Sequence, residues 1–348
     1  VKVSLGDDDL QTFSGFSSGP VTDSGKLLYR VSVEKHDQNG FKNNTYLDRD
    51  DTNKRDELTT RVKLRWYATD DLQADLTLLH ANFDNGYDAW TLDNNGTNTL
   101  TDKPGVDNQK TTGVGLKFSY TGAKYFEVTS LTSFANTDHQ HAYDGDWANP
   151  EYWASKQCTA YDSDWNVSGT EPCVYDYIWN KDGERKTISQ EFRLSSNQAS
   201  RIFNESTDWL VGVYAMNLKE DNDLYSEYNT WPDEVLQSNY QATNYAVFGQ
   251  LDSQLGADYL LSTGLRFETR DANYQDSNGL DVSPTDSMWG GQISLNHEIS
   301  KGLNSYVTLS RGYKAGGFNL SLSVPDELRE YQPESLLNLE TGIKGYFM

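Results

Sequence analysis

Most stretches of this chain alternate apolar and polar residues with a period of two. Tyr259–Glu268 places Tyr, Leu, Leu and Phe on one face and Ser, Gly, Arg and Glu on the other. Leu27–Glu34, Leu72–Leu78 and Leu337–Lys344 repeat this pattern, and helical spacing is not sustained anywhere. Successive side chains of a strand point to opposite faces, so the alternation predicts strands with one face in contact with water, and an all-β fold.

Short and long connections follow one another along the chain. Short turn signals occur at residues 20–25, 69–71, 121–124, 254–258 and 300–302. The long polar stretches between them are His36–Asp56, Asn82–Lys110, Thr137–Arg185, Lys219–Gln241, Arg270–Ser287 and Ala315–Ser335. In an antiparallel up-and-down sheet, this order puts short turns at one end and long loops at the other. That sorting is typical of transmembrane β-barrels, which have short periplasmic turns and long extracellular loops. Ser195–Asp208 is the exception, a longer connection at the short end.

The length of the segments agrees with strands that cross a membrane. Leu72–Phe83 has 12 residues and Asp258–Arg270 has 13, and a tilted strand needs about 9–11 to cross a bilayer. Aromatic residues stand at many segment ends: Trp66, Tyr67, Tyr120, Tyr125, Trp209, Tyr259, Tyr313 and Tyr346. Their position favours aromatic girdles at the two membrane interfaces. The alternative is that aromatic residues are common here only because they have a high propensity for β-strands. The segments number about thirteen, an odd count for a bacterial barrel.

The composition excludes several classes of protein. The 348 residues include 29 Lys and Arg against 52 Asp and Glu, a formal charge of −23. Nucleic-acid phosphates require clustered cations, so we expect no nucleic-acid partner. No run of about 20 apolar residues occurs, which excludes a transmembrane helix. Aromatic residues make up 13% of the chain, which disfavours a disordered acidic protein.

Both ends of the chain are abrupt. Val1–Leu10 lacks the basic start and apolar centre of a signal peptide. Thr341–Met348 stops inside an expected strand. Together with the odd strand count, these ends predict a fragment of a longer protein or a chain trimmed at both ends.

Several motifs carry a resemblance to a known family. Ser310–Asn319 reads SRGYKAGGFN and is followed by YQPE at Tyr331–Glu334 and NLETGIK at Asn338–Lys344. SQEFRL at Ser189–Leu194 and YAVFGQ at Tyr245–Gln250 precede them. In order and spacing, this set resembles the barrel of TonB-dependent outer-membrane receptors, particularly the siderophore-receptor-like branch. The similarity runs over nearly the whole chain.

The resemblance implies a 22-stranded barrel whose lumen is occluded by an N-terminal plug domain. Such receptors bind scarce ligands outside the cell and import them with energy passed through TonB. We therefore expect residues 1–348 to be barrel, with the plug before Val1 and the last strands after Met348. The expected partners are the TonB complex, an iron chelate such as a ferric siderophore, and the lipid and lipopolysaccharide of the bacterial outer membrane. We expect no cofactor and no enzymatic activity, because no catalytic constellation has supporting context.

Two alternative functions stay open at this stage. One is a soluble extracellular β protein that holds glycans through aromatic loops, and the other is a porin without a plug. An apolar outward band about 25 Å tall would distinguish either barrel from the soluble protein. A plug-sized upstream domain would distinguish the receptor from the porin.

Cys158 and Cys173 are the only cysteines, 15 positions apart in the longest loop. An oxidised pair would close that loop and contribute about 3 kcal/mol. Disulfides persist outside the cell and in the periplasm, so we predict this bridge in preference to two independent thiols. A zinc site is not predicted, because no His or second Cys pair completes a ligand set.

The same loop is rich in aromatic residues, and two roles for them stay open. They either stack on a ligand, such as a sugar or the aromatic groups of a siderophore, or form a small core of the loop itself. The candidate ligand-binding residues are Tyr143, Trp147, Tyr152, Trp153, Trp165 and Tyr175.

Two features suggest metal ligands and are interpreted otherwise. EF-hand-like spacing occurs at Asp162, Asp164, Asn166 and Ser168. Val167 stands where an EF-hand needs Gly and Cys173 where it needs Glu, so a solvated acidic surface is favoured. His139 and His141 would share one face of a strand, but we interpret them as polar loop residues. No metal site is predicted.

Charged residues on the polar side of the alternation are expected to face the lumen. They are Arg193, Arg266, Glu191, Glu268, Glu340 and Lys344. Ion pairing with the plug is the favoured role, and contact with an anionic ligand is the alternative.

Overall fold

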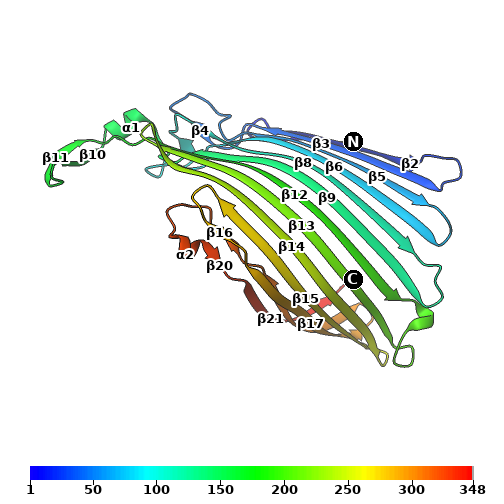
Figure 1. The fold of residues 1–348 in the computed structure, drawn as a ribbon. Helices are drawn as coiled ribbons and strands as arrows, with labels where there is room; N and C mark the ends of the chain where they lie inside the picture. The colour runs from blue at the N-terminus through cyan, green and yellow to red at the C-terminus, as the bar shows by residue number, and fades with distance from the viewer. Residues whose placement is uncertain (347–348) are drawn as a thin grey trace.

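The computed structural model describes residues 1–346 and is almost entirely β (Figure 1). Fourteen of the described strands form one antiparallel meander in which each strand pairs with the next. In order these are β1 (Lys2–Leu5), β2 (Gln11–Pro20), β3 (Leu27–Gln38), β5 (Arg55–Tyr67), β6 (Leu72–Tyr87), β8 (Gly105–Tyr120), β9 (Phe126–Asp144), β12 (Tyr177–Ser196), β13 (Thr207–Tyr228), β14 (Trp231–Leu255), β15 (Tyr259–Asp276), β17 (Thr285–Ser300), β18 (Leu303–Lys314) and β21 (Glu334–Gly345). Phe347 and Met348, the end of the expected last strand, lie outside the described residues.

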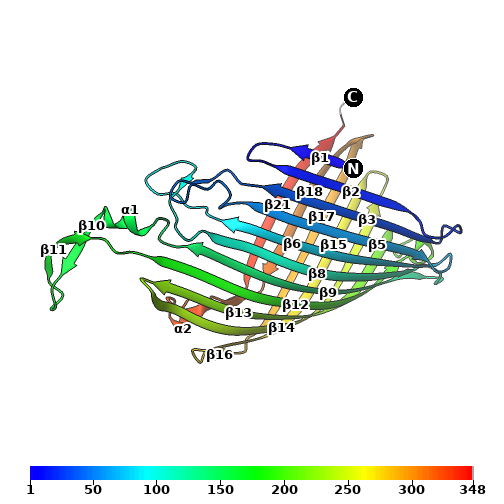
Figure 2. The same cartoon turned by 90° about the horizontal axis from the view of Figure 1, so that it is seen from above.

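Short additional strands and helices lie between the long strands. The short strands are β4 (Asn43–Asn44), β7 (Asn98–Thr99), β10 (Gln157–Tyr161), β11 (Val167–Pro172), β16 (Asp281–Val282), β19 (Gly317–Phe318) and β20 (Glu330–Tyr331). The helices are α1 (Pro150–Ala154), α2 (Asp326–Arg329) and the 3₁₀ turn Gln198–Ser200. None of the helices in residues 1–346 has the length and apolar character to span a membrane. Figures 1 and 2 show the meander curving, with the long loops gathered at one end and the short turns at the other.

The fold confirms the antiparallel up-and-down class and the sorting of the loops, and corrects two details. The sequence predicts about thirteen strands, and the meander contains fourteen in residues 1–346, beginning with β1 and β2. Lys219–Gln241 is predicted as a long loop, but β13 and β14 run through it and leave only Asn229 and Thr230 as the turn. The sequence does not reveal the strands in this stretch, because neither face of the sheet is apolar there and no period-two pattern results.

The sheet has one apolar and one polar face. Directly paired residues form an apolar row across five strands: Phe192, Val213, Val247, Phe267 and Trp289. Their side chains are 47–55% exposed. A second row holds Leu78, Val114, Phe134 and Ile188. Contiguous exposed rows of this kind are expected where a barrel wall faces lipid.

Aromatic residues border the apolar rows at the short-turn end. Trp66 is 52% exposed, Tyr120 41% and Tyr125 52%. Their rings can bury an apolar body in lipid while a polar tip meets water, which suits an interfacial girdle. The opposite face carries the charged residues, and it is the face that the sequence analysis expects to line a lumen.

Candidate functional site

Four aromatic rings meet on the polar face near the long-loop end, and we name them the mouth cluster. Tyr87 is the last residue of β6, His141 and Tyr143 lie within the last four residues of β9, and Trp179 is the third residue of β12. The Tyr143 and Trp179 rings stack with centroids 5.2 Å apart, and His141 meets Tyr87 edge-on at 4.6 Å. Pairing opposite Tyr143 brings Trp179 into this contact, although 36 positions separate them in sequence.

Charged groups lie directly beside the mouth cluster. Lys181 is the register partner of His141, and its ammonium is 4.0 Å from the Glu220 carboxylate. Arg185 donates to the same carboxylate at 2.7 Å. Burial lowers the pKa of Lys181, although Glu220 opposes that shift. Desolvation likewise lowers the pKa of His139, whose ring occupies the space beside Gly183 that a Cβ would fill.

The mouth cluster can bind a flat or delocalised ligand through its ring faces. The partly buried Lys181 and the exposed Arg185 beside the rings would add charge-assisted bonds to an anionic group. Of the aromatic candidates named in the sequence analysis, Tyr143 alone lies in this cluster. The sequence gives no sign of Tyr87 or Lys181, because only the strand pairing brings them to Tyr143.

The remaining aromatic candidates fall into two other environments. Trp153 packs edge-on against Tyr152 at 5.2 Å and against Tyr175 at 5.0 Å. Its indole nitrogen donates to Asp146 Oδ1 at 3.1 Å. These three rings therefore pack as the loop's own core. By contrast, Trp147 stacks on Trp90 at the surface, and Trp165 is 83% exposed at a hairpin tip.

The β10–β11 hairpin carries the disulfide and the EF-hand-like spacing. Cys158 and Cys173 are bonded, which ties the two ends of the hairpin together. The Asp162 Oδ1 atom accepts from the amides of Asp164 and Asn166 at 2.9 Å, so the spacing builds a tight turn. Within residues 1–346, no three His, Cys, Asp or Glu side chains are grouped to hold a metal ion.

A buried carboxylate lies at the base of the long loop. Asp144 is 3% exposed, and its Oδ2 atom has no hydrogen-bond partner in the described residues. Burial, together with the charges of Asp146 and Asp102, raises the pKa of Asp144 to about 8. The neighbouring Asp146 carboxylate accepts hydrogen bonds from the Ala148 and Tyr177 amides at 2.9 and 3.1 Å.

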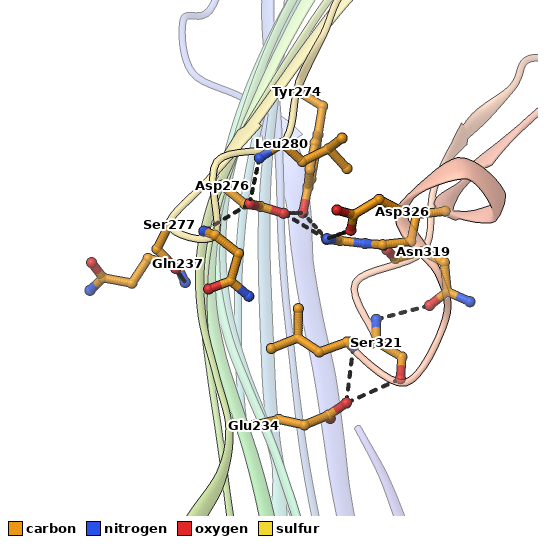
Figure 3. Close-up of polar contacts among 12 residues, drawn as sticks. Glu234, Gln237, Tyr274, Asp276, Ser277, Leu280, Asn319, Ser321 and Asp326 are labelled. Atoms are coloured by element: carbon orange, nitrogen blue, oxygen red, sulfur yellow. Dashed lines mark hydrogen bonds and ion pairs between the residues drawn. The ribbon is translucent and has the colours of Figure 1, made fainter.

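Residues 315–333, which we name the inward segment, fold onto the polar face of β14 and β15. Its residue Arg329 forms a fully buried ion pair with Asp276 at 2.7 Å. Phe318 stacks on Tyr274 with centroids 4.7 Å apart. Glu234 accepts from the Leu322 amide at 3.0 Å. Figure 3 shows Tyr274, Asp276 and Glu234 on the wall facing Asp326 and Ser321 of the segment.

The charged wall residues named from the sequence lie on the polar face. Arg266 binds the Glu268 carboxylate at 2.7 Å, and Tyr313 donates to the same carboxylate at 2.8 Å. Arg193 pairs with Glu191. Glu340 accepts from Tyr306, and the Lys344 ammonium lies 4.9 Å from the centroid of the same Tyr306 ring.

Comparison with known proteins identifies the family. Residues 82–348 match the family "TonB dependent receptor-like, beta-barrel". The chain belongs to this family. Its members are outer-membrane proteins of Gram-negative bacteria, and the outer membrane is therefore the location of this chain.

Solved structures show the same fold. The ferric yersiniabactin uptake receptor FyuA from Yersinia pestis matches with a TM-score of 0.77 at 18% identity, over 99% of this chain and 51% of that one. FpvA of Pseudomonas aeruginosa, solved with pyoverdines, matches with a TM-score of 0.71 at 14% identity, over 99% and 46%. The ferric-catecholate import receptor Fiu of Escherichia coli K12 matches with a TM-score of 0.67 at 13% identity, over 99% and 55%. The chain thus spans about half the length of these receptors.

Proposed function

We propose that this chain is the ligand-gathering part of the wall of an outer-membrane receptor that imports a ferric siderophore with energy from TonB. The mouth cluster is the observation that carries the proposal. Its rings lie on the lumenal side at the extracellular end, where an arriving ligand first meets the wall. The receptors solved with the same fold bear names that refer to ferric chelates, which supports this ligand class.

The chemistry of the mouth cluster suits such a chelate. Ferric siderophores present delocalised iron-binding groups to their surroundings. Stacked Tyr143 and Trp179 offer ring faces to those groups. Lys181 and Arg185 lie two and six residues after Trp179 on the same face of β12 and offer positive charge to an anionic chelate.

Binding and uptake by the full-length receptor test the proposal. Quenching of tryptophan fluorescence would be titrated with two probes, an Fe(III)–catecholate and an Fe(III)–trihydroxamate chelate. Tyr143→Ala combined with Trp179→Ala should weaken binding of the preferred probe at least tenfold. Trp165→Ala, an exposed tryptophan outside the cluster, serves as the matched control and should bind like wild type.

Uptake of radioactive iron in iron-starved cells tests the energy coupling. Import should stop when TonB is deleted, while binding at the surface persists. Binding of neither chelate, or equal loss in the Trp165→Ala control, would contradict the proposal. Saturable binding of an oligosaccharide in place of iron would instead support a glycan receptor.

A further inference from the structure

An apolar groove crosses the apolar face of the sheet, the face opposite the mouth cluster. It has a volume of about 1000 Å³, at the upper end of the range of small-molecule sites. Side chains of β12, β13, β14, β15, β17 and β18 line it, and β21 contributes only Leu337. Because the groove lies on the side of the wall that faces away from the expected lumen, a domain inside that lumen would not cover it.

The floor of the groove is one row of register partners that contains two glycines. In order across the strands, the row is Arg311, Gly291, Leu265, Gly249 and Val211. A Cβ on Gly291 would lie 2.7 Å from the carbonyl oxygen of Gly264, so only glycine fits at this close approach. The backbone itself therefore forms part of the floor.

Two rows of mostly large apolar side chains flank this floor. One is the exposed apolar row described above, which runs from Phe192 to Trp289. The row on the other side holds Trp209, Leu251, Thr263, Ile293 and Leu309. A floor of glycines between two apolar rows makes a channel that suits hydrocarbon chains.

In residues 1–346, Arg311 is the only charged residue that lines the groove. Its guanidinium carbon lies 4.3 Å from the centroid of the Trp289 ring, and its Nη1 atom donates to the Trp289 carbonyl oxygen. Its register partners on the two neighbouring strands, Gly291 and Leu337, carry no charge. A cation on an apolar face is costly unless an anion accompanies it, and the guanidinium has further N–H groups to donate.

The groove and Arg311 together match the shape of a phosphorylated lipid. Arg311 lies near the end of β18 that leads into the long segment 315–333, which is the extracellular end. From Arg311 to Val211 the floor crosses four strand spacings, about 19 Å. One leaflet provides about 15 Å of hydrocarbon, so acyl chains that hang from a headgroup at Arg311 can follow the floor. Guanidinium groups bind phosphate oxygens in pairs, which favours a phosphate as the headgroup contact.

We propose that this groove binds lipopolysaccharide, the phosphorylated glycolipid of the outer leaflet, with a phosphate on Arg311 and an acyl chain over Gly291 and Gly249. The extracellular position of Arg311 favours this lipid over the phospholipids of the periplasmic leaflet. The site is independent of the imported ligand, because the mouth cluster lies on the other face of the wall.

Native mass spectrometry of the purified full-length receptor in mild detergent tests the site. The probes are lipid A with its phosphates, lipid A without phosphates, and phosphatidylglycerol. Wild type should retain phosphorylated lipid A most strongly. Arg311→Gln should weaken its retention at least about tenfold, because charge-assisted hydrogen bonds to the phosphate are lost. This variant should also retain the two forms of lipid A alike, whereas Arg311→Lys should keep part of the preference for phosphate.

A second variant tests the floor, and a control tests general surface charge. A Cβ on Gly249 would lie 3.3 Å from the Leu210 carbonyl oxygen, so Gly249→Val needs only a small shift and fills the floor. It should weaken retention of both forms of lipid A and keep the preference for phosphate. Lys219→Gln removes a cation from the same face of β13 outside the groove and should retain lipid A like wild type.

Three results would overturn the proposal: no retention of lipid A by wild type, equal weakening in Arg311→Gln and Lys219→Gln, or stronger retention of phosphatidylglycerol than of lipid A. Thermal unfolding without added lipid checks that the variants fold. If Gly249→Val fails to fold, the comparison of Arg311→Gln with Lys219→Gln still decides the proposal.

Discussion

At the scale of single residues, the buried carboxyl of Asp144 makes the stability of the fold at the base of the long extracellular loop depend on pH. Its pKa in the folded protein is about 8, whereas an ordinary aspartate titrates near 3.9. Between these values the folded chain holds a proton that the unfolded chain has lost. The resulting stabilisation is fully present below about pH 4 and is lost as the pH rises to about 8.

The neutral variant Asp144→Asn should remove this pH dependence. Wild type should lose up to about 1.4 kcal/mol of unfolding free energy per pH unit across that window. The variant should be nearly as stable at pH 8 as at pH 5, measured by thermal unfolding and by proteolysis of residues 145–176. Asp164→Asn, at the exposed hairpin tip, should keep the wild-type slope. A wild-type slope in Asp144→Asn would assign the pH dependence to another group.

At the scale of elements, the inward segment depends on one buried ion pair. Arg329→Ala leaves the Asp276 carboxylate buried without its partner, and such a loss costs about 3–5 kcal/mol. The segment should detach from β15, so protease cleavage within residues 315–333 should become faster. Asp326→Asn is the control, since that carboxylate is 71% exposed and lies 3.4 Å from Arg329. Equal protection of Arg329→Ala and wild type would show that Phe318 stacking alone holds the segment.

The elements also show where sequence patterns fail. Alternation predicts the strands that carry the apolar rows, because lipid requires one face of those strands to be apolar. In Asp221–Tyr228 both faces carry polar residues, so the pattern that marks a strand disappears although β13 continues. The sequence predicts the short turns close to where the structure has them, because a turn needs particular residues wherever it lies.

The mouth cluster illustrates the same limit for the site. Sequence alone indicated an aromatic-rich loop and left open whether its rings bind a ligand or pack together. Pairing between strands decides which rings meet: Tyr143 joins Trp179 and Tyr87 on the wall, whereas Trp153 joins Tyr175 in the loop. Such contacts between distant segments are set by register, which residue types do not encode.

At the scale of the whole molecule, the two faces of the sheet differ in polarity: one is apolar and suits contact with lipid, and the other is polar and suits contact with a ligand. Apolar rows cover one face across most of the meander, and the charged residues and the mouth cluster lie on the other. A strongly acidic chain can thus enter a membrane, because its charges lie on the lumenal face or on strands and loops beyond the apolar rows.

This division predicts opposite tolerance to charge on the two faces of one strand. Val213→Arg puts a cation into an apolar row of β13 and should destabilise the receptor by about 2–4 kcal/mol near the bilayer midplane. Met216→Arg, on the polar face between Ser189 and Asn244, should cost much less. Urea unfolding of the full-length receptor in lipid vesicles measures both. If the two variants unfold alike, the apolar rows do not face lipid, and a protein–protein contact must cover them instead.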